Sequence, residues 1–246
     1  MNNDLTAEET RKFILNSPYL YASYNSLYKE MVKLTDTYGF SNAVKIEIGS
    51  SGGFLRNLIP DLITSDVRPD LQLSLVSSGT ALPFQDETLG AIYLKDTLHH
   101  IPDVNSFFLD ALRALGPGGV IVCADPYWGL LAQLIYRFFH PEPFDKSSKE
   151  WAFESTNFFM ANQALLWKVI VRDADRFSSL YPEFEIIRIR PTIGLSYILS
   201  GGVTGKQIVP SWFLLRLHQF ETRTNFWRKH FAMTYLCVFR KKPTFS

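Results

Sequence analysis

Short apolar runs recur along the chain with longer amphipathic stretches between them, which is the pattern of an α/β fold. We expect helices at residues 53–59 and 104–115, the second beginning after Asp103 as its cap. Strands are predicted at residues 44–48, 62–65, 71–76, 89–94, 120–124, 184–190 and 235–240. Because parallel strands need crossover connections, this alternation predicts a mostly parallel, doubly wound sheet with helices on both faces.

The first forty residues predict one or two amphipathic helices ahead of the first strand. Thr6 and Glu9 have the spacing of a capping box, in which each side chain bonds the backbone N–H of the other residue. Ser17-Pro18 predicts a break, because the residue before a proline avoids helical geometry. We therefore treat residues 1–40 as a helical region that precedes a sheet domain, residues 41–246.

Connections of unusual length mark three places in the predicted sheet. Only a few residues, including Arg68-Pro69, separate the second and third strands, so we expect an irregular link without a crossover helix. Two aromatic-rich insertions, at about 126–181 and 191–234, follow the fifth and sixth strands. Loops after parallel strands lie at the carboxyl edge of a sheet. The insertions therefore predict a cap that lines a substrate pocket, or one whose aromatic side chains only fill its own core.

The turn after the first strand carries the strongest chemical signal. Glu47 comes at the end of that strand, and Gly49-Ser50-Ser51-Gly52-Gly53 follows it. Small side chains let a nucleotide lie against bare backbone, whereas the alternative is a tight turn that binds nothing. Asp66 ends the second strand about 20 residues later, where an acid can bind ribose hydroxyls.

Further motifs follow in order. They are Ala81-Leu82-Pro83-Phe84, Leu98-His99-His100-Ile101-Pro102-Asp103 and Arg113-Ala114-Leu115-Gly116-Pro117-Gly118-Gly119. Together with the glycine turn they resemble the class I S-adenosylmethionine-dependent methyltransferases, specifically the type 11 branch, from Val44 to about Asp125. The resemblance implies an enzyme with S-adenosylmethionine as cofactor. It also implies a Rossmann-like, seven-stranded sheet with an antiparallel last strand and a helical cap.

The resemblance assigns roles to single residues. Glu47 is expected to meet the methionine ammonium, and Asp66 the ribose hydroxyls. The other expected cofactor contacts are Gly49, Ser50, Ser51, Gly52, Gly53, Val67, Ser78, Gly79, Thr80, Ala81, Lys95, Asp96 and His100. An amino-terminal helix often roofs the cofactor in this family, so Tyr24 or Tyr28 can line the pocket. Otherwise these helices simply pack on the sheet.

Two departures from the family pattern bear on cofactor binding. Ser51 stands where the middle glycine of the turn is usual, and its β-carbon resists positive φ. Ser77-Ser78-Gly79-Thr80 stands where an acid usually binds the adenine amino group. A hydroxyl or carbonyl can replace that acid, but a charge-assisted hydrogen bond is lost. The alternative that this chain is a relative with weak cofactor affinity or without turnover therefore stays open.

Methyl transfer needs no nucleophilic side chain, because the cofactor carries the reactivity and the protein supplies position. A general base helps an oxygen or nitrogen acceptor, and His99 and His100 are the candidates, with Tyr127 and His140 in the next insertion as further ones. The alternative for both histidines is structural, with each imidazole bonding a backbone carbonyl. Cys123 is disfavoured as a nucleophile because its alternating run places it in the sheet.

The acceptor is expected to be a small molecule or a glycan-type molecule. Residues 140–145 and 199–203 resemble features of a bacterial subset of the branch that is linked to cell-surface glycan or lipid-linked sugar assembly. Trp212-Phe213 with Arg216 and other basic residues could let a cap touch an anionic membrane or a lipid-linked acceptor, or could form a plain packing helix.

Composition narrows the classes further. The chain has 25 basic and 24 acidic residues among 246, so it has no strong positive electrostatic field that would attract nucleic acid. Cys123 and Cys237 have no metal-type spacing and are interpreted as reduced core residues of a cytoplasmic protein, and no metal site is expected. No apolar run approaches the ~20 residues needed to cross a bilayer. The oligomeric state is left open.

Two other functions compete with the methyltransferase hypothesis. One is a binding or scaffold protein that kept the fold without turnover, which Ser51 and the missing adenine-site acid favour. The other is a nicotinamide-dependent oxidoreductase, whose glycine turn also lets a nucleotide lie against bare backbone. It fits less well because residues 49–53 lack the Gly-x-Gly-x-x-Gly spacing.

Overall fold

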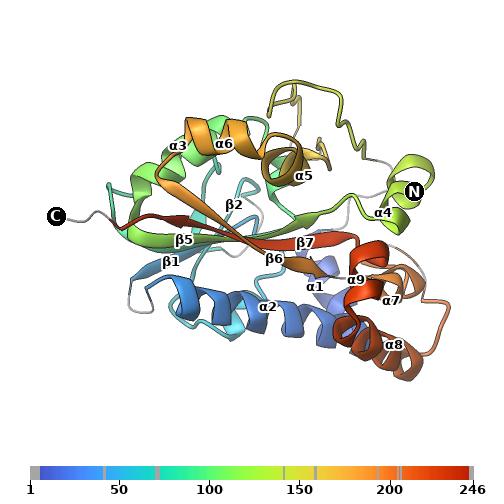
Figure 1. The fold of residues 1–246 in the computed structure, drawn as a ribbon. Helices are drawn as coiled ribbons and strands as arrows, with labels where there is room; N and C mark the ends of the chain where they lie inside the picture. Colours follow the sequence, from blue (N-terminus) through green and yellow to red (C-terminus); the bar gives the residue numbers. More distant parts are fainter. Residues whose placement is uncertain are drawn as a thin grey trace.

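The structure is a computed structural model that describes residues 6–40, 43–69, 73–140, 142–157, 160–192, 194–203, 205 and 207–243. Its centre is a seven-stranded sheet with the order β3-β2-β1-β4-β5-β7-β6 (Figure 1). The strands are β1 (Val44–Ile48), β2 (Ile63–Asp66), β3 (Leu75–Val76), β4 (Leu89–Lys95), β5 (Leu115–Pro126), β6 (Phe184–Thr192) and β7 (Thr234–Lys241). β7 runs antiparallel to both of its neighbours, and the other adjacent pairs are parallel. The predicted Rossmann-like sheet with an antiparallel last strand is confirmed.

The strands differ from their predicted bounds mainly at β3 and β5. β5 begins at Leu115 because that residue already pairs with Leu89 of β4, so the Pro-Gly-Gly segment belongs to the strand. β3 is shorter than predicted, and residues 71 and 72 of that prediction lie outside the described residues. β2 and β3 still pair in parallel, and the described part of their short link contains no helix, as predicted.

Two helices precede the sheet. Thr6 caps α1 (Ala7–Asn16) through a complete capping box with Glu9. Ser17 then caps α2 (Pro18–Tyr38), with the proline in its first turn, so the predicted start and break are confirmed. The remaining helices are α3 (Val104–Ala114), α4 (Leu130–Phe138), α5 (Leu165–Trp167), α6 (Ala174–Leu180), α7 (Leu195–Leu199), α8 (Ser211–Arg223) and α9 (Asn225–Phe231).

The helix predicted over residues 53–59 is wrong. The structure has only a 3₁₀ turn there, η1 (Leu55–Asn57). Gly53 at φ +65° cannot begin a helix, and Pro60 cannot continue one, so too few residues remain for a stable nucleus. The glycine turn therefore has no long helix behind it.

The sheet is covered on both faces, as the doubly wound prediction required. Ile121 and Cys123 of β5 face a layer formed with α3 and α6, whereas Val120 and Val122 face the layer formed with α2. This alternation is the period of a strand buried on both sides. Figure 1 shows α3, α5 and α6 on one face and α1 and α2 on the other. The first insertion contributes to this core, because Trp151 and Phe177 pack with Phe108 of α3.

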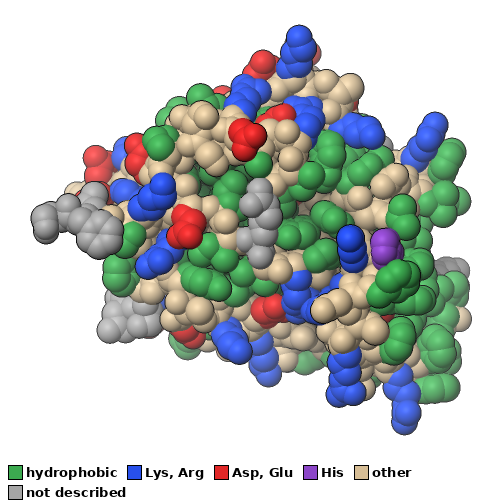
Figure 2. Space-filling model, viewed as in Figure 1, with side chains coloured by type: hydrophobic (Ala, Val, Ile, Leu, Met, Phe, Trp, Pro, Cys, Tyr) green, Lys and Arg blue, Asp and Glu red, His purple; other side chains and the backbone are tan. Residues whose placement is uncertain are grey.

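Helices α4, α7, α8 and α9 gather at one end of the sheet (Figure 1). Large hydrophobic side chains are exposed on α4, α8 and α9, and Figure 2 shows hydrophobic and basic side chains side by side at this end. We call this surface the apolar edge. Its exposed members are Leu130, Leu134, Phe138, Phe139, Ile208, Trp212, Phe213, Phe220 and Phe226. In the described part of the chain, no helix is long and apolar enough to span a bilayer.

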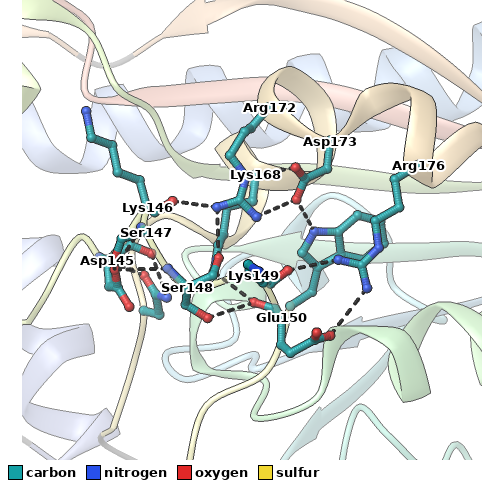
Figure 3. Close-up of polar contacts among 12 residues, drawn as sticks. Asp145, Lys146, Ser147, Ser148, Lys149, Glu150, Lys168, Arg172, Asp173 and Arg176 are labelled. Carbon is teal, nitrogen blue, oxygen red and sulfur yellow. Dashed lines mark hydrogen bonds and ion pairs between the residues drawn. The ribbon is translucent and has the colours of Figure 1, made fainter.

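A strap, residues 145–151, is clamped onto η3 (Lys168–Arg172) and α6 (Figure 3). Arg172 Nη1 donates to the carbonyl of Ser148 at 2.8 Å, and Arg176 Nη1 donates to that of Lys149 at 2.8 Å. The buried Lys168 donates to the carbonyl of Glu150 at 2.8 Å. These bonds satisfy a run of carbonyls that forms no sheet, so they fix the path of the first insertion.

The division at residues 1–40 and 41–246, with cap insertions, stays a prediction.

Candidate cofactor and acceptor site

The glycine turn and Asp66 meet at the carboxyl edge of the sheet. The Ser50 N–H donates to the carbonyl of Ser65 at 2.9 Å, and the Ser65 N–H donates to Ser50 Oγ at 3.1 Å. The Ser51 N–H points at Asp66 Oδ2 across 3.4 Å. The two sequence motifs that define the expected cofactor site therefore lie side by side.

Positive φ angles shape the turn. Gly49 has φ +70° and Gly53 has φ +65°, and Ser51 itself takes φ +40°, although the sequence indicated resistance to such a conformation. The neighbouring Gly52 does not have a positive φ, so the left-handed conformation falls on Ser51 itself. A β-carbon at Gly49 would lie 2.5 Å from Thr97, whereas one at Gly53 meets no atom within 4 Å. The turn is thus packed against Thr97 on one side and open on the other.

Glu47 is a buried carboxyl with an unused oxygen. Its Oε2 atom has no hydrogen-bond partner among the described residues, and 1% of the residue is exposed. Burial raises the pKa of Glu47 to about 8, against the opposing effects of Tyr28, Ser50 and Lys95. A buried carboxyl of this kind fits a cationic group such as an ammonium, whose arrival would favour the ionised form.

Asp66 lies where a ribose acid is needed but already has a cationic partner. The Arg68 guanidinium donates to both carboxylate oxygens, each at 3.2 Å, and the Arg68 N–H donates to Oδ1 at 3.2 Å. Hydroxyls that approach Asp66 must share or displace these bonds. The sequence alone does not indicate that Arg68 binds Asp66 in this position.

The segment expected at the adenine lies beside β1. Gly79 packs so closely that a β-carbon there would lie 3.0 Å from Ile101 Cδ1 and 3.5 Å from Ile48 Cγ2. Ser78 and Thr80 bond each other through their hydroxyls at 2.8 Å. Ala81 donates its N–H to the carbonyl of Ser78 at 3.3 Å, which closes the turn. Val67 is exposed next to Asp66.

The amino-terminal helices reach over the turn. Arg11 of α1 bonds the carbonyl of Gly52 and lies over the Phe54 ring at 5.1 Å. Tyr24 of α2 stacks under the Lys95 ammonium, which lies 4.1 Å from the ring centroid and is paired with Asp96. α1 and α2 therefore contact the same loops that carry the expected cofactor residues.

These observations satisfy the needs of S-adenosylmethionine. Glu47 offers an unpartnered buried oxygen to the ammonium of its methionine part. Asp66 offers a carboxylate to the ribose, and Gly53 leaves open space that a side chain would fill. The residues present thus fit the adenosyl and methionine parts of the cofactor.

His99 and Asp125 form a buried pair next to this site. Asp125 Oδ1 accepts from His99 Nδ1 at 3.0 Å and from the Thr97 N–H at 2.9 Å, and Oδ2 accepts the His99 N–H at 3.1 Å. Burial disfavours a charged imidazole, but the Asp125 carboxylate outweighs it and raises the pKa of His99. The sequence analysis did not single out Asp125, although its place at the end of β5 could have marked it.

The other expected acceptor residues divide into two groups. His100 lies against His99 with ring centroids 4.3 Å apart, and burial lowers its pKa. His140 is adjacent, because its Nδ1 accepts the Glu142 N–H at 3.2 Å. Tyr127 belongs instead to the β7 side, where its ring lies 5.1 Å from Tyr235. Cys123 and Cys237 are buried thiols at opposed positions of β5 and β7.

Glu142 completes the histidine cluster, although the sequence analysis assigned it no role. Its Oε2 lies 3.8 Å from His99 Nε2 and accepts a hydrogen bond from Gln163. The first insertion delivers both residues, since the Gln163 N–H donates to the carbonyl of Pro143 at 3.0 Å and the Asn162 N–H to that of His99 at 2.9 Å. Only the fold brings this carboxylate to the end of β4.

Comparisons with known proteins agree with this fold. Residues 59–123 match the model of a methyltransferase domain family. A SAM-dependent methyltransferase from Thermotoga maritima is similar over 96% of this chain and 99% of its own, with 12% identity and a TM-score of 0.53. YcgJ from Bacillus subtilis is similar over 86% of this chain and 97% of its own, with 14% identity and a TM-score of 0.51. No curated protein matches the chain.

The matched domain and the fold agree with each other. Residues 59–123 match a methyltransferase domain and the whole chain has the fold of SAM-dependent methyltransferases, which indicates a methyltransferase with S-adenosylmethionine as its cofactor.

Proposed function

We propose that this enzyme transfers the methyl group to an oxygen or nitrogen of a small-molecule or glycan-type acceptor at the His99 cluster. The observation that carries the proposal is the position of Thr97. Its side chain is packed against Gly49 of the cofactor turn, and its N–H bonds Asp125 of the histidine pair. A ligand on the turn and an acceptor at His99 are therefore neighbours, as an in-line transfer requires.

The chain's own residues supply binding and orientation. When bound, S-adenosylmethionine supplies an electrophilic methyl group on a positively charged sulfur. Glu47 and Asp66 bind its ammonium and its ribose, and α1 and α2 cover the turn to exclude water. His99, His100 and Glu142 then hold a hydroxyl or amine by polar contacts. Tyr127, on the β7 side, is assigned to the wall of the acceptor pocket.

The apolar edge supports a lipid-linked glycan among these acceptors. Aromatic side chains such as Trp212, Phe213 and Phe226 are exposed beside basic ones, including Arg137, Arg216, Arg223 and Lys229. Large exposed apolar patches mark interaction surfaces, and aromatic residues with basic neighbours suit the interface of an anionic bilayer. α4 of this edge begins shortly after Asp125, the strand end that holds His99.

The proposal also includes a bacterial, cytoplasmic setting without a nucleic-acid partner. The buried thiols Cys123 and Cys237, opposed in β5 and β7, support a reducing compartment. The nearly balanced charge of the chain supports an acceptor other than a polyanion.

Two measurements test the proposal in sequence. Calorimetric titration with S-adenosylhomocysteine is expected to show one site per chain. A methyl-release assay should then give turnover with hydroxyl or amine acceptors, first free and then lipid-linked in anionic vesicles. Cofactor binding without turnover on any acceptor pool would favour a scaffold that kept the fold.

A further inference from the structure

His99, His100 and Glu142, the cluster assigned above to the acceptor, also have the side-chain chemistry of a metal site. One ligand-type atom from each residue lies within 4.8 Å of the other two. We propose that these three side chains bind one divalent transition-metal ion of the zinc type. The sequence has no metal-type spacing, because Glu142 comes from the first insertion and the histidines from η2 (Leu98–His100).

Hydrogen bonds at the far nitrogens prepare both imidazoles. The carbonyl of Met160 can only accept, so His100 Nδ1, 3.2 Å away, carries the proton. The Asp125 carboxylate likewise accepts from His99 Nδ1. Each ring therefore has Nε2 free of the structural bond. Metal-binding histidines nearly always donate their other ring N–H to a carboxylate or a backbone carbonyl, and here one ring uses each kind of partner.

Glu142 is oriented in the same manner. Gln163 donates to Oε2 of its carboxylate, and the backbone N–H of Glu142 bonds His140 Nδ1. The carboxylates of Glu142 and Asp125 thus lie on opposite sides of the His99 ring, and their negative charge favours a cation between them. Thr97 and Asn162 hold this arrangement through backbone bonds to Asp125 and His99.

The distances suit a four-coordinate ion. Two ligand atoms each about 2.0–2.2 Å from zinc lie roughly 3.4 Å apart in a tetrahedron. His99 Nε2 and Glu142 Oε2, at 3.8 Å, are close to that separation. The three ligand atoms lie within 4.8 Å of one another, so side-chain rotations have to bring them about 1 Å closer in the widest case. Two nitrogens and one oxygen favour zinc and its first-row neighbours over magnesium or calcium, which prefer oxygen ligands.

Three protein ligands leave one coordination position open. Resting on the proposed function, we assign that position to the acceptor oxygen. The ion would lower the pKa of a hydroxyl coordinated at that position and hold it for attack. The hydroxyl oxygen would form a bond to the methyl carbon as the carbon–sulfur bond of S-adenosylmethionine breaks, S-adenosylhomocysteine would leave, and the hydroxyl proton would pass to solvent or to a nearby carboxylate. The competing arrangement is a protonated His99 that pairs with Glu142, with no ion present.

Titration of the metal-free protein with Zn²⁺ alone, and absorption spectroscopy with Co²⁺, test the site. We expect one ion per chain, and at least about tenfold weaker binding in His100→Ala and Glu142→Gln. The matched controls are His230→Ala on α9 and Glu154→Gln, an exposed acid of the same insertion, and these should bind as the wild type does. Thermal unfolding verifies that each variant is folded.

Two results would overturn the proposed metal site. If folded wild-type protein takes up no stoichiometric Zn²⁺, or if His100→Ala and Glu142→Gln bind as tightly as the controls, the cluster is an ion pair. Methyl release by metal-free enzyme at the full rate would remove the acceptor role but keep the proposed function. Failure of S-adenosylhomocysteine binding would instead count against the proposed function and leave the metal result standing.

Discussion

Glu47 connects cofactor binding to pH at the scale of a single residue. Its pKa is raised to about 8 in the folded chain from a reference value of 4.5, because burial disfavours the charge. The folded state then holds a proton that the unfolded state has released. Stability therefore falls as the pH rises from about 4.5 to 8, by at most about 5 kcal/mol.

Glu47→Gln should flatten this dependence, because an amide has no proton to lose. Urea unfolding at pH 5 and pH 8 measures the effect, with Glu154→Gln as an exposed control. A wild-type curve that is flat over this range would show that Glu47 is ionised in the folded chain. In the wild type, binding of S-adenosylhomocysteine should release a proton near pH 7.

Ser51 carries strain in the glycine turn. Its φ of +40° costs a residue with a β-carbon roughly 1–2 kcal/mol. Ser51→Gly relieves the strain but adds freedom to the unfolded chain, so its stability should stay within about 1 kcal/mol of the wild type. Ser51→Val should lower the free energy of unfolding by more than about 1 kcal/mol relative to the wild type, because a β-branched side chain tolerates this φ least. Denaturant midpoints that place the valine variant level with the glycine variant would contradict the strain.

Asp66 and Arg68 make opposite predictions for cofactor affinity. Asp66→Asn removes charge-assisted bonds to the ribose and should weaken S-adenosylhomocysteine binding about tenfold. Arg68→Ala frees the carboxylate and should tighten binding by roughly two- to fivefold, the scale of a partly exposed ion pair. Asp61→Asn, an exposed acid, is the calorimetric control. Weaker binding by Arg68→Ala would mean that the arginine contacts the ligand itself.

Single residues were predictable where the backbone alone sets their place. Glu47 and the turn at residues 49–53 follow from the end of β1, and Asp66 from the end of β2. Asp125 and Glu142 were missed for another reason. Their roles depend on pairs such as His99–Asp125, which join residues that only the folded sheet and the first insertion bring together. Arg68 is different, because its partner Asp66 is only two residues away and the sequence analysis treated Arg68 only as part of a link between strands.

At the scale of elements, periodicity and caps located most of the fold. Buried strands were recognisable as apolar runs. Thr6 and Asp103 marked helix starts that the structure shows, and Ser17-Pro18 marked the break between α1 and α2. The helix predicted at residues 53–59 is absent because Gly53 and Pro60 leave too few residues between them for a stable helix. The small helices of the insertions could not be derived, since their ends depend on contacts such as those of Arg172 and Lys168 with the strap.

Helix α1 should act as a cover for the cofactor through Arg11. Arg11→Ala removes the bond to Gly52 and the contact with Phe54, so S-adenosylhomocysteine should dissociate a few times faster. Lys12→Ala, on the exposed side of the same helix, provides the control. Stopped-flow release rates that are equal in the two variants would make α1 a packing helix only.

At the scale of the whole molecule, the apolar edge predicts membrane contact. Trp212→Ala with Phe213→Ala should reduce co-sedimentation with anionic vesicles, and added salt should weaken the wild-type association. Leu109→Ala, an exposed leucine on α3 on the other face of the sheet, should behave as the wild type. Equal sedimentation of all three proteins would leave the edge for a protein partner.

Thr97 has a consequence for the precision of the reaction. The glycine turn packs against the Thr97 side chain, and the Thr97 backbone N–H donates a hydrogen bond to Asp125 of the histidine pair. Under the proposed function, a displacement of this one residue moves the supports of the donor and of the acceptor together, so we expect their alignment to survive small distortions of the scaffold. The edge of the sheet would then position both reactants through one shared residue.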